Sequence, residues 1–424
     1  MPLEIIRDPL WSNIRLDPLA LRLVDTPAFQ RLRYVRQLGL AYLVYPGATH
    51  SRFEHALGAY HLARNTLSLL GERDLLVDLP ARECDVVRAA ALLHDVGHYP
   101  VSHALEEIGA LHHEEVARPL ILEGAVAEAL AEALGADAPA QVFALIRGES
   151  RSPLQGLISG ALDLDKIEYL KRDAFMCGVT YGEIDVDRLT HSLVIVDDPE
   201  TGTRRIGIRE KGLAALEALL FAKYQMYRNV YWHHAVRSAT AMYKRLVDDA
   251  LSESRLDAQA LARYTDEGIL FALQGDVVPP LLLALRHRRL YKRAVERPAA
   301  ELPDEMGEWM ASDRALAVAA EDQLARELGL APGELLLDYP AKTQMLGLDL
   351  PVLRRDGSVQ HLTRAGVDGA INLPGLADQL YRSARWLRVF VARPVDVSPE
   401  RLLAAAVRPA DEVRDRLARG AAML

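Results

Sequence analysis

The chain has 424 residues, of which 50% are hydrophobic and 26% charged, a composition that indicates a globular protein and excludes wholesale disorder. The formal net charge of −9 disfavours a protein that coats duplex nucleic acid. Its two cysteines cannot supply a disulfide framework or an all-thiolate zinc site. No signal peptide and no membrane-spanning apolar run are visible, so we expect a cytoplasmic protein.

Helical spacing of apolar residues dominates the first 280 residues. After an irregular or extended start, Pro18 to Leu40 shows this spacing together with many arginines. A helix over Ser51 to Leu70 follows, with Thr49 or Ser51 as its N-cap. The further predicted helices are Cys84–His98, Glu114–Leu134, Ala138–Ile146, one or two over Leu154–Met176, and a long helix over about 211–251.

Strand patterns come later in the chain. Two β-rich runs, Ser192–Val196 and Arg204–Ile208, flank a turn-forming cluster and predict a hairpin. Beyond Pro279, turns alternate with short strand-like runs such as Leu335–Asp338 and Trp386–Val391. We therefore expect a mostly α fold, with a helical core over 1–295 and a smaller α+β C-terminal lobe over 296–424. A parallel-sheet core is not expected, because strands do not alternate with crossover helices before residue 190.

The most informative segment begins at His94 and Asp95, which follow an apolar stretch of a predicted helix. A buried carboxylate is costly unless a cation compensates it, and a metal ion would do so. His98 lies four residues after His94 and would share its helix face. The alternative is a hydrogen-bonded His–Asp pair in a structural core.

Two other predicted helices carry polar groups that share a face. Arg52 and His55 are three residues apart. Lys166, Tyr169 and Asp173 form a stripe on a later helix. The alternative for that stripe is a solvated amphipathic face.

The order of these residues resembles the HD-domain phosphohydrolases, whose metal ligands follow as His, His-Asp and Asp. The resemblance implies that the ligands are His55, His94, Asp95 and Asp165. Two imidazoles and two carboxylates suit Mn, Mg, Fe, Co, Ni or Zn, so a divalent metal ion is the implied cofactor. The number of ions stays open.

Longer strings narrow the resemblance to the dNTP triphosphohydrolase branch, which includes the sterile-alpha-motif/HD enzyme of animal cells and bacterial dNTPases. They are residues 25–39, 46–58 and 164–173, within a similarity that runs from about Ile5 to Asp249. No sterile-alpha-motif domain precedes them. Hydrolysis of dNTP to deoxynucleoside and inorganic triphosphate is therefore the leading expectation.

The resemblance also implies how a dNTP substrate would be held. Asp173 and Gln37 would grip the sugar 3′-hydroxyl, while Tyr169 and Tyr231 would stack against the sugar and leave little room for a 2′-hydroxyl. Alternatively, Tyr231 is only a core aromatic and Gln37 only a polar surface residue. The implied cationic partners of the triphosphate are Arg52, His98, His103, Lys166 and Lys223.

His113 and Glu114 align with the family's catalytic histidine–carboxylate pair. His113 would protonate the leaving oxygen or orient water, with Glu114 fixing its tautomer. His98 is the competing general acid. A cluster that merely caps a helix is the alternative, and we expect no catalytic role for the His233–His234 pair.

Two other classes of function stay open. An HD phosphodiesterase or single-strand nuclease could use the same metal, with nucleic acid as its partner, although the net charge of −9 counts against a long basic channel. A non-catalytic nucleotide sensor is the third class, and the intact ligand set argues against it.

The resemblance further implies a homo-oligomer, with a tetramer favoured over a dimer, and an activating nucleotide at a subunit interface. The matching positions are Asp25, Gln30, Arg33 and Arg188. Glu4 stands where the animal enzyme has a lysine for activator phosphates, so nucleotide activation should be weakened or altered. The alternative is that Asp25-Thr-Pro is only a helix cap and turn.

Overall fold

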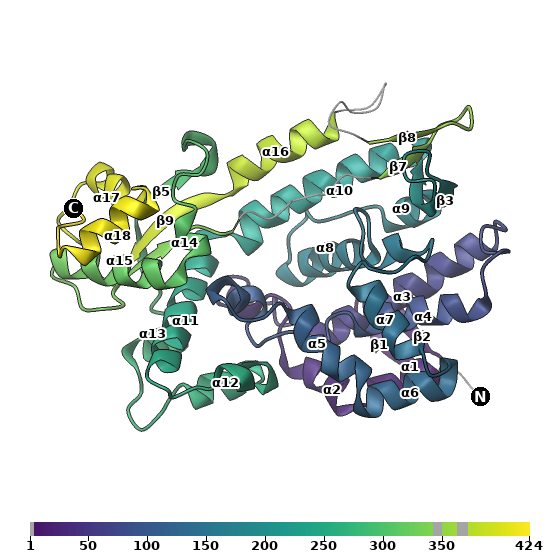
Figure 1. The fold of residues 1–424 in the computed structure, drawn as a ribbon, viewed down its shortest axis with the longest axis horizontal. Helices are drawn as coiled ribbons and strands as arrows, with labels where there is room; N and C mark the ends of the chain where they lie inside the picture. The colour runs from purple at the N-terminus through teal and green to yellow at the C-terminus, as the bar shows by residue number, and fades with distance from the viewer. Residues whose placement is uncertain (1–3, 342–349, 363–371) are drawn as a thin grey trace.

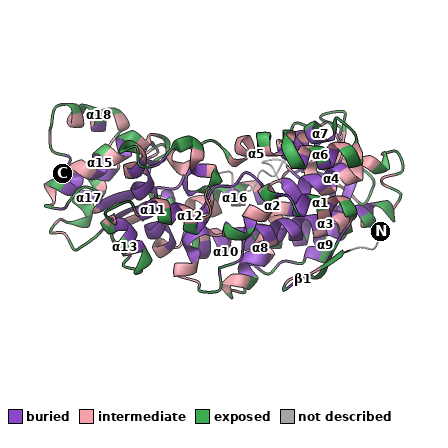
Figure 2. Cartoon of the chain, turned by 90° about the horizontal axis from the view of Figure 1, so that it is seen from below, coloured by how far each residue is buried: buried purple, intermediate pink, exposed green. Residues whose placement is uncertain are grey.

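The computed structural model describes residues 4–341, 350–362 and 372–424. Figure 1 shows an elongated chain, with the helices of the N-terminal half gathered at one end and the C-terminal lobe at the other. Buried residues run through both ends in Figure 2. The fold is mostly helical with small sheets, as the sequence predicts.

The N-terminal half forms one continuous hydrophobic core, to which most of its helices contribute. The helices of this part are α1 (Pro18–Val24), α2 (Pro27–Gln30), α3 (Arg52–Gly71), α4 (Ala81–Leu93), α5 (His113–Leu122), α6 (Gly124–Leu134), α7 (Ala138–Ile146), α8 (Leu164–Cys177), α9 (Val186–Ser192) and α10 (Leu213–Met226).

The first 43 residues differ from expectation. The chain opens with an antiparallel hairpin of β1 (Glu4–Asp8) and β2 (Ser12–Leu16), which the sequence suggested only as an extended start. The helical spacing of Pro18–Leu40 corresponds to two short helices and 3₁₀ turns rather than to one continuous helix. Thr26 caps a new helix at Pro27, and that helix passes into short 3₁₀ turns, because the Thr-Pro pair ends one helix and starts the next.

Helix α3 forms as predicted and is the central helix of the core. Ser51 caps it, and the Glu54 carboxylate accepts a 2.7 Å hydrogen bond from the Ser51 hydroxyl in a capping box. Its buried residues lie on all sides, as in a helix enclosed by its neighbours.

Helix α4 ends at Leu93, five residues before the predicted end. His94 is its C-cap, and the chain then turns away. The prediction that His98 shares a helix face with His94 is therefore wrong. Gly97 permits the turn to pack against α5, because a Cβ at this position would lie 2.2 Å from the His113 carbonyl oxygen.

Other long predicted helices are broken, while α7 has the predicted bounds. The helix predicted over Glu114–Leu134 is two helices, with the break at Gly124, whose φ of +65° is a left-handed conformation. The long helix predicted over 211–251 is interrupted by a π-helical turn over Tyr227–Tyr231 and resumes as α11 (His234–Ser252). Tyr231, at the end of the π turn, lies beside α8, where its hydroxyl donates to Asp173.

The predicted hairpin is β3 (Leu193–Asp197) with β4 (Arg204–Arg209), paired antiparallel. Strand β7 (Pro351–Leu353) adds parallel to β4, and β8 (Val359–His361) pairs with β7. The second predicted pair of strands lies in a separate antiparallel sheet of order β5 (Lys292–Pro298), β9 (Trp386–Val391) and β6 (Leu335–Asp338).

The remaining helices surround this second sheet or lie between the two ends. Helix α16 runs beside α10 and contacts it (Figure 1). Because β7 pairs with β4 and β5 crosses residue 295, the division into 1–295 and 296–424 stays a prediction. These helices are α12 (Asp266–Ala272), α13 (Pro280–Arg286), α14 (Trp309–Ser312), α15 (Arg314–Glu327), α16 (Leu373–Ala384), α17 (Pro399–Ala406) and α18 (Ala410–Ala418).

Among the described helices, none by itself has the length and apolar character that crossing a bilayer needs. Helices α6 and α7 have the required length and apolar character only when they are taken together, and this pair is bent by 111°.

Candidate active site

Three of the four predicted metal ligands meet where α3 passes the end of α4. One ligand atom from each of His55, His94 and Asp95 lies within 4.8 Å of the other two. The Nε2 atoms of the two histidines are 3.2 Å apart. The Nδ1 atom of His94 lies 2.9 Å from the Ala91 carbonyl oxygen, which can accept a hydrogen bond from a protonated Nδ1. The lone pair of Nε2 then faces the cluster.

The fourth predicted ligand, Asp165, reaches the cluster from the first turn of α8. Its Oδ1 atom lies 2.9 Å from His55 Nε2 and 3.4 Å from His94 Nε2. Residues from three helical segments, up to 110 positions apart, thus bring two imidazoles and two carboxylates together. This donor set fits a divalent metal ion.

A second layer of buried groups holds His55, and sequence analysis missed it. Glu168 Oε2 lies 2.6 Å from His55 Nδ1. Its other oxygen accepts hydrogen bonds of 2.8 Å from Trp11 Nε1 and from Arg172 Nε, and Arg172 also donates to Asp8 at 3.0 Å. Such outer carboxylates orient metal-binding imidazoles.

The electrostatics of the cluster favour a cation. Burial alone would lower the pKa of His55, but its hydrogen bonds to Asp165 and Glu168 raise it to about 10. Burial would raise the pKa of Asp95, yet Arg52 and His94 hold it well below its usual range. A buried site that stabilises positive charge on an imidazole also suits a divalent ion.

Two predicted partners of the triphosphate contact the carboxylate of Asp95. The Arg52 guanidinium donates to Asp95 and to the Ser102 hydroxyl. His98 Nε2 lies 3.2 Å from Asp95 Oδ1. Burial and the nearby charges of Arg52 and His113 keep the pKa of His98 well below its usual range.

A histidine cluster, defined as His98, His103, Glu106 and His113, adjoins the ligands. One nitrogen or oxygen from each member lies within 4.8 Å of the others. The rings of His98 and His113 stack with centroids 3.8 Å apart and an interplanar angle of 16°. His103 is the most exposed of the three histidines, and its Nδ1 lies 3.3 Å from Glu106 Oε2.

The prediction that Glu114 fixes the tautomer of His113 is wrong. Glu106 Oε1, and not Glu114, lies 2.8 Å from His113 Nδ1, and it also accepts a bond from the His113 amide at 3.2 Å. Glu114 instead accepts a 3.1 Å bond from Arg147. The only sequence signal for Glu106 was its position three residues after His103, which is insufficient without the fold.

Two predicted lysines lie near Asp165. Lys166 Nζ donates to the Gly160 carbonyl oxygen at 2.9 Å and to the Asp163 carboxylate. Lys223, on α10, is buried, and burial together with the positive charge of Lys166 lowers its pKa to about 8. The ammonium groups of Lys166 and Lys223 are therefore close enough for one charge to lower the pKa of the other.

The predicted sugar-binding residues gather around Asp173. Its carboxylate accepts a 2.7 Å hydrogen bond from the Tyr231 hydroxyl, and its other oxygen lies 2.8 Å from His50 Nε2. The rings of Tyr169 and Tyr231 are 6.4 Å apart. Tyr231 is thus more than a core aromatic, and sequence analysis missed His50.

Gln37 is buried, so it is not the polar surface residue of the alternative interpretation. The backbone N–H of Gln37 donates to the His50 carbonyl oxygen at 3.0 Å, which places Gln37 beside the Asp173 group. Within the described residues its side-chain oxygen has no hydrogen-bond partner. A buried free acceptor is costly, so a ligand hydroxyl there would be favoured.

The residues predicted to contact an activating nucleotide do not all meet within one chain. Gln30 accepts a 2.8 Å bond from Arg33, whose guanidinium stacks 3.5 Å over the Phe53 ring. Asp25 is exposed at the end of α1. Arg188 lies on α9 and donates to the Lys211 carbonyl oxygen at 3.3 Å. Glu4 is exposed on β1.

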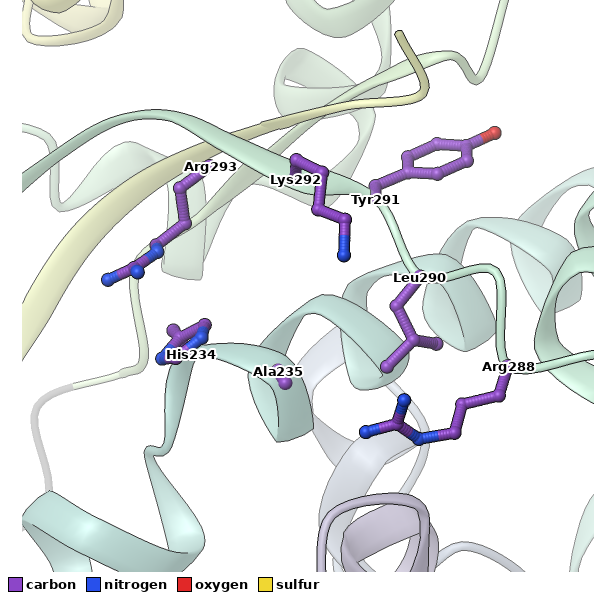
Figure 3. A pocket seen from close by; sticks show the side chains of 7 residues that line it. All are labelled: His234, Ala235, Arg288, Leu290, Tyr291, Lys292 and Arg293. Carbon is purple, nitrogen blue, oxygen red and sulfur yellow. The ribbon is translucent and has the colours of Figure 1, made fainter.

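A basic pocket of about 370 Å³ lies between the start of α11 and β5, and none of its residues was predicted as part of the site. In Figure 3 the Lys292 ammonium group points into the space between the two elements, and the Tyr291 ring points away from it. Its lining carries the cationic side chains of Arg288, Lys292 and Arg293, which make the local potential positive. The lining residues are His234, Ala235, Arg288, Leu290, Tyr291, Lys292 and Arg293.

Residues 52–172 match the HD domain, and residues 184–366 match the HD associated region. The chain is therefore an HD-domain protein with an HD-associated region.

Individual proteins are also similar to this chain in sequence. An uncharacterized protein of Methanocaldococcus jannaschii is 36% identical over 69% of this chain and 60% of its own length. Human deoxynucleoside triphosphate triphosphohydrolase SAMHD1 is 29% identical over 63% of this chain and 46% of its own. The chain thus spans less than two thirds of these curated relatives.

A solved structure matches over a greater length. The crystal structure of a phosphohydrolase from Bacteroides thetaiotaomicron superposes with a TM-score of 0.71 at 25% identity. The match covers 92% of this chain and 100% of that one.

Proposed function

We propose that this protein is a metal-dependent phosphohydrolase that cleaves deoxynucleoside triphosphates to a deoxynucleoside and inorganic triphosphate. The observation that carries the proposal is the convergence of His55, His94, Asp95 and Asp165 in one cluster, in which His55 and Asp95 are buried. Similarity to the Bacteroides phosphohydrolase supports the class of reaction. Similarity to human SAMHD1 supports the class of substrate.

The four clustered residues would hold a divalent ion. When bound, such an ion supplies Lewis-acid polarisation of a phosphoryl oxygen and a lowered pKa for an attacking water. Arg52, fixed against Asp95, keeps a positive charge beside the cluster. That charge would help to neutralise a bound triphosphate.

The histidine cluster would handle the proton. Cleavage breaks the bond between the α-phosphorus and the 5′-oxygen, so that oxygen needs a proton as it leaves. Glu106 holds Nδ1 of His113, which leaves Nε2 to deliver the proton. His98, stacked on His113, is the competing donor.

Sugar recognition would come from the group around Asp173. The carboxylate, held by Tyr231 and His50, offers an acceptor to the 3′-hydroxyl, and Gln37 lies beside it. Tyr169 would close the space around the 2′ carbon. Lys166, Lys223 and His103 would face the triphosphate, which needs several cations.

The test is product analysis with each dNTP and the matching ribonucleotide, in Mn²⁺ and separately in Mg²⁺. We expect free deoxynucleoside and triphosphate from the dNTP and much less from the ribonucleotide. Asp95→Ala should abolish both turnover and metal retention. Release of monophosphate and pyrophosphate would contradict the proposed bond cleavage, and full activity in Asp95→Ala would contradict the site.

Labelled single-stranded DNA serves as a parallel substrate. Shortening of the DNA without dNTP turnover would favour the phosphodiesterase or nuclease alternative. Absence of both reactions, with nucleotide still bound, would favour a non-catalytic sensor.

We also propose a homo-oligomer, a tetramer rather than a dimer, that responds to a nucleotide through Asp25, Gln30, Arg33 and Arg188. The support is the exposed guanidinium of Arg33, held in place by Gln30 and Phe53. Sedimentation and turnover across a titration of GTP and dGTP test it. A monomer active without any second nucleotide would rule out both assembly and activation.

A further inference from the structure

A buried ion network joins α11 to the segment that carries the histidine cluster. The Arg237 guanidinium donates two parallel hydrogen bonds to the Glu107 carboxylate, each 2.8 Å long. Lys244, two turns further along α11, donates to the same carboxylate at 2.8 Å. Bidentate guanidinium–carboxylate pairs fix orientation as well as position.

Glu107 is the sequence neighbour of Glu106, which holds His113. Both belong to the three-residue 3₁₀ turn Glu106–Ile108. Fixing one side chain of so short a turn restricts where the next one can point. Leu105, just before the turn, is fully buried in the same hydrophobic core as the inner face of α11.

The network extends into the C-terminal sheet. Arg237 also donates to Asp338 on β6, at 3.0 Å from Nε and 2.5 Å from Nη2. Asp338 and Arg237 are almost entirely buried, so each charge depends on its partners. The turn is therefore held by α11 and, through Arg237, is linked to β6, and neither element carries a predicted metal ligand.

We propose that Arg237 is a positioning residue for the reaction: through Glu107 it fixes the turn that places Glu106 against His113. The inference rests on the proposed function for its catalytic consequence. Its structural part, that the Arg237–Glu107 pair keeps the backbone of residues 102–113 well ordered, does not depend on what the enzyme hydrolyses. The two parts are measured separately.

The main variant is Glu107→Ala in the full chain. It frees the turn yet leaves Arg237 paired with Asp338, so the buried guanidinium keeps a partner. Hydrogen exchange of residues 102–113 should become faster, with exchange in α3 and α8 unchanged. The value of kcat should fall about 10- to 100-fold, the usual result of a misplacement of roughly 1 Å, while KM and metal content stay at wild-type values.

Arg385→Gln is the matched control. Arg385 is buried and makes a bidentate pair with Glu308 of 2.6 and 2.8 Å, but it contacts no residue of the turn among those described. It should lower thermal stability without faster exchange at 102–113. Arg237→Gln is the stronger variant of the network, and if it does not fold, Glu107→Ala still decides the question.

The outcomes separate the two proposals. Unchanged exchange at residues 102–113 in Glu107→Ala, or a loss of metal equal to the loss of kcat, would overturn the positioning role. If exchange at residues 102–113 becomes faster in Glu107→Ala but the wild-type protein hydrolyses no dNTP, the structural link is kept and the proposed function is refuted. Combining Glu107→Ala with Glu106→Gln should reduce kcat by less than the product of the two single effects.

Discussion

Replacing Glu168 by glutamine keeps the side-chain shape but removes one hydrogen-bond acceptor. Three donors share its two oxygens: His55 Nδ1 at 2.6 Å, and Trp11 Nε1 and Arg172 Nε at 2.8 Å each. Glutamine offers one carbonyl oxygen and one NH₂ group. Whichever way it turns, at least one of these donors then faces the NH₂ group.

The cost follows from the number of bonds lost. A hydrogen bond to a charged partner contributes about 1.5–3 kcal/mol. An NH₂ group facing Trp11 and Arg172 would lose two bonds, whereas one facing His55 loses a single bond, so the second orientation is favoured. In that orientation Nδ1 of His55 must become the acceptor, and the proton moves to Nε2, the atom that faces His94 and Asp165. Metal affinity should then fall about 10- to 100-fold, as for other outer partners of metal-binding histidines.

The assay is a Mn²⁺ binding titration of wild type and Glu168→Gln, with thermal unfolding of both in chelator. Unfolding without metal measures the loss of hydrogen bonding at position 168 separately from the loss of metal. Glu114→Gln is the control, because its carboxylate is paired with Arg147 and not with a predicted ligand. Wild-type Mn²⁺ affinity in Glu168→Gln would refute the role of this carboxylate in orienting His55.

Three further predictions concern other parts of the site. Gly58→Ala should destabilise the protein by about 1–3 kcal/mol, since its Cβ would lie 1.9 Å from Glu168 Oε1, whereas Gly71→Ala in the same helix meets nothing closer than 3.8 Å and should be neutral by thermal unfolding. Lys223 is charged below its pKa of about 8 and neutral above it, so kcat/KM for dNTP should fall as pH rises through 8; Lys223→Arg should flatten that fall, and an unchanged profile would exclude Lys223 from phosphate binding. His113→Ala should lower kcat about 10²- to 10⁴-fold with metal still bound, and loss of metal instead would mean that His113 is a ligand.

The sequence alone determined the fold class and the nature of the cluster. Apolar residues that recur every three to four positions placed α3 and α7 closely. Two β-rich runs around a turn cluster placed the hairpin of β3 and β4. The four predicted ligands were named because their order in the chain resembles that of the HD-domain phosphohydrolases, and the residues alone left a structural His–Asp pair as the alternative.

Helix ends and the side-chain partners across the site were decided by tertiary structure. Periodicity carried α4 on to His98, but packing of Gly97 against α5 ends the helix at Leu93 and turns His98 onto His113. Helical propensity alone contains no information about such a long-range contact.

The same limit explains the missed residues. Glu106 replaced Glu114 as the partner of His113 because a 3₁₀ turn held by α11 aims it there, not because of its distance in sequence. Glu168 meets Trp11 across 157 residues, and His50 meets Asp173 across 123. A buried polar group takes whichever partner the packed chain brings within reach, since leaving it unpaired costs more than the bond itself contributes, and only the folded chain specifies that partner.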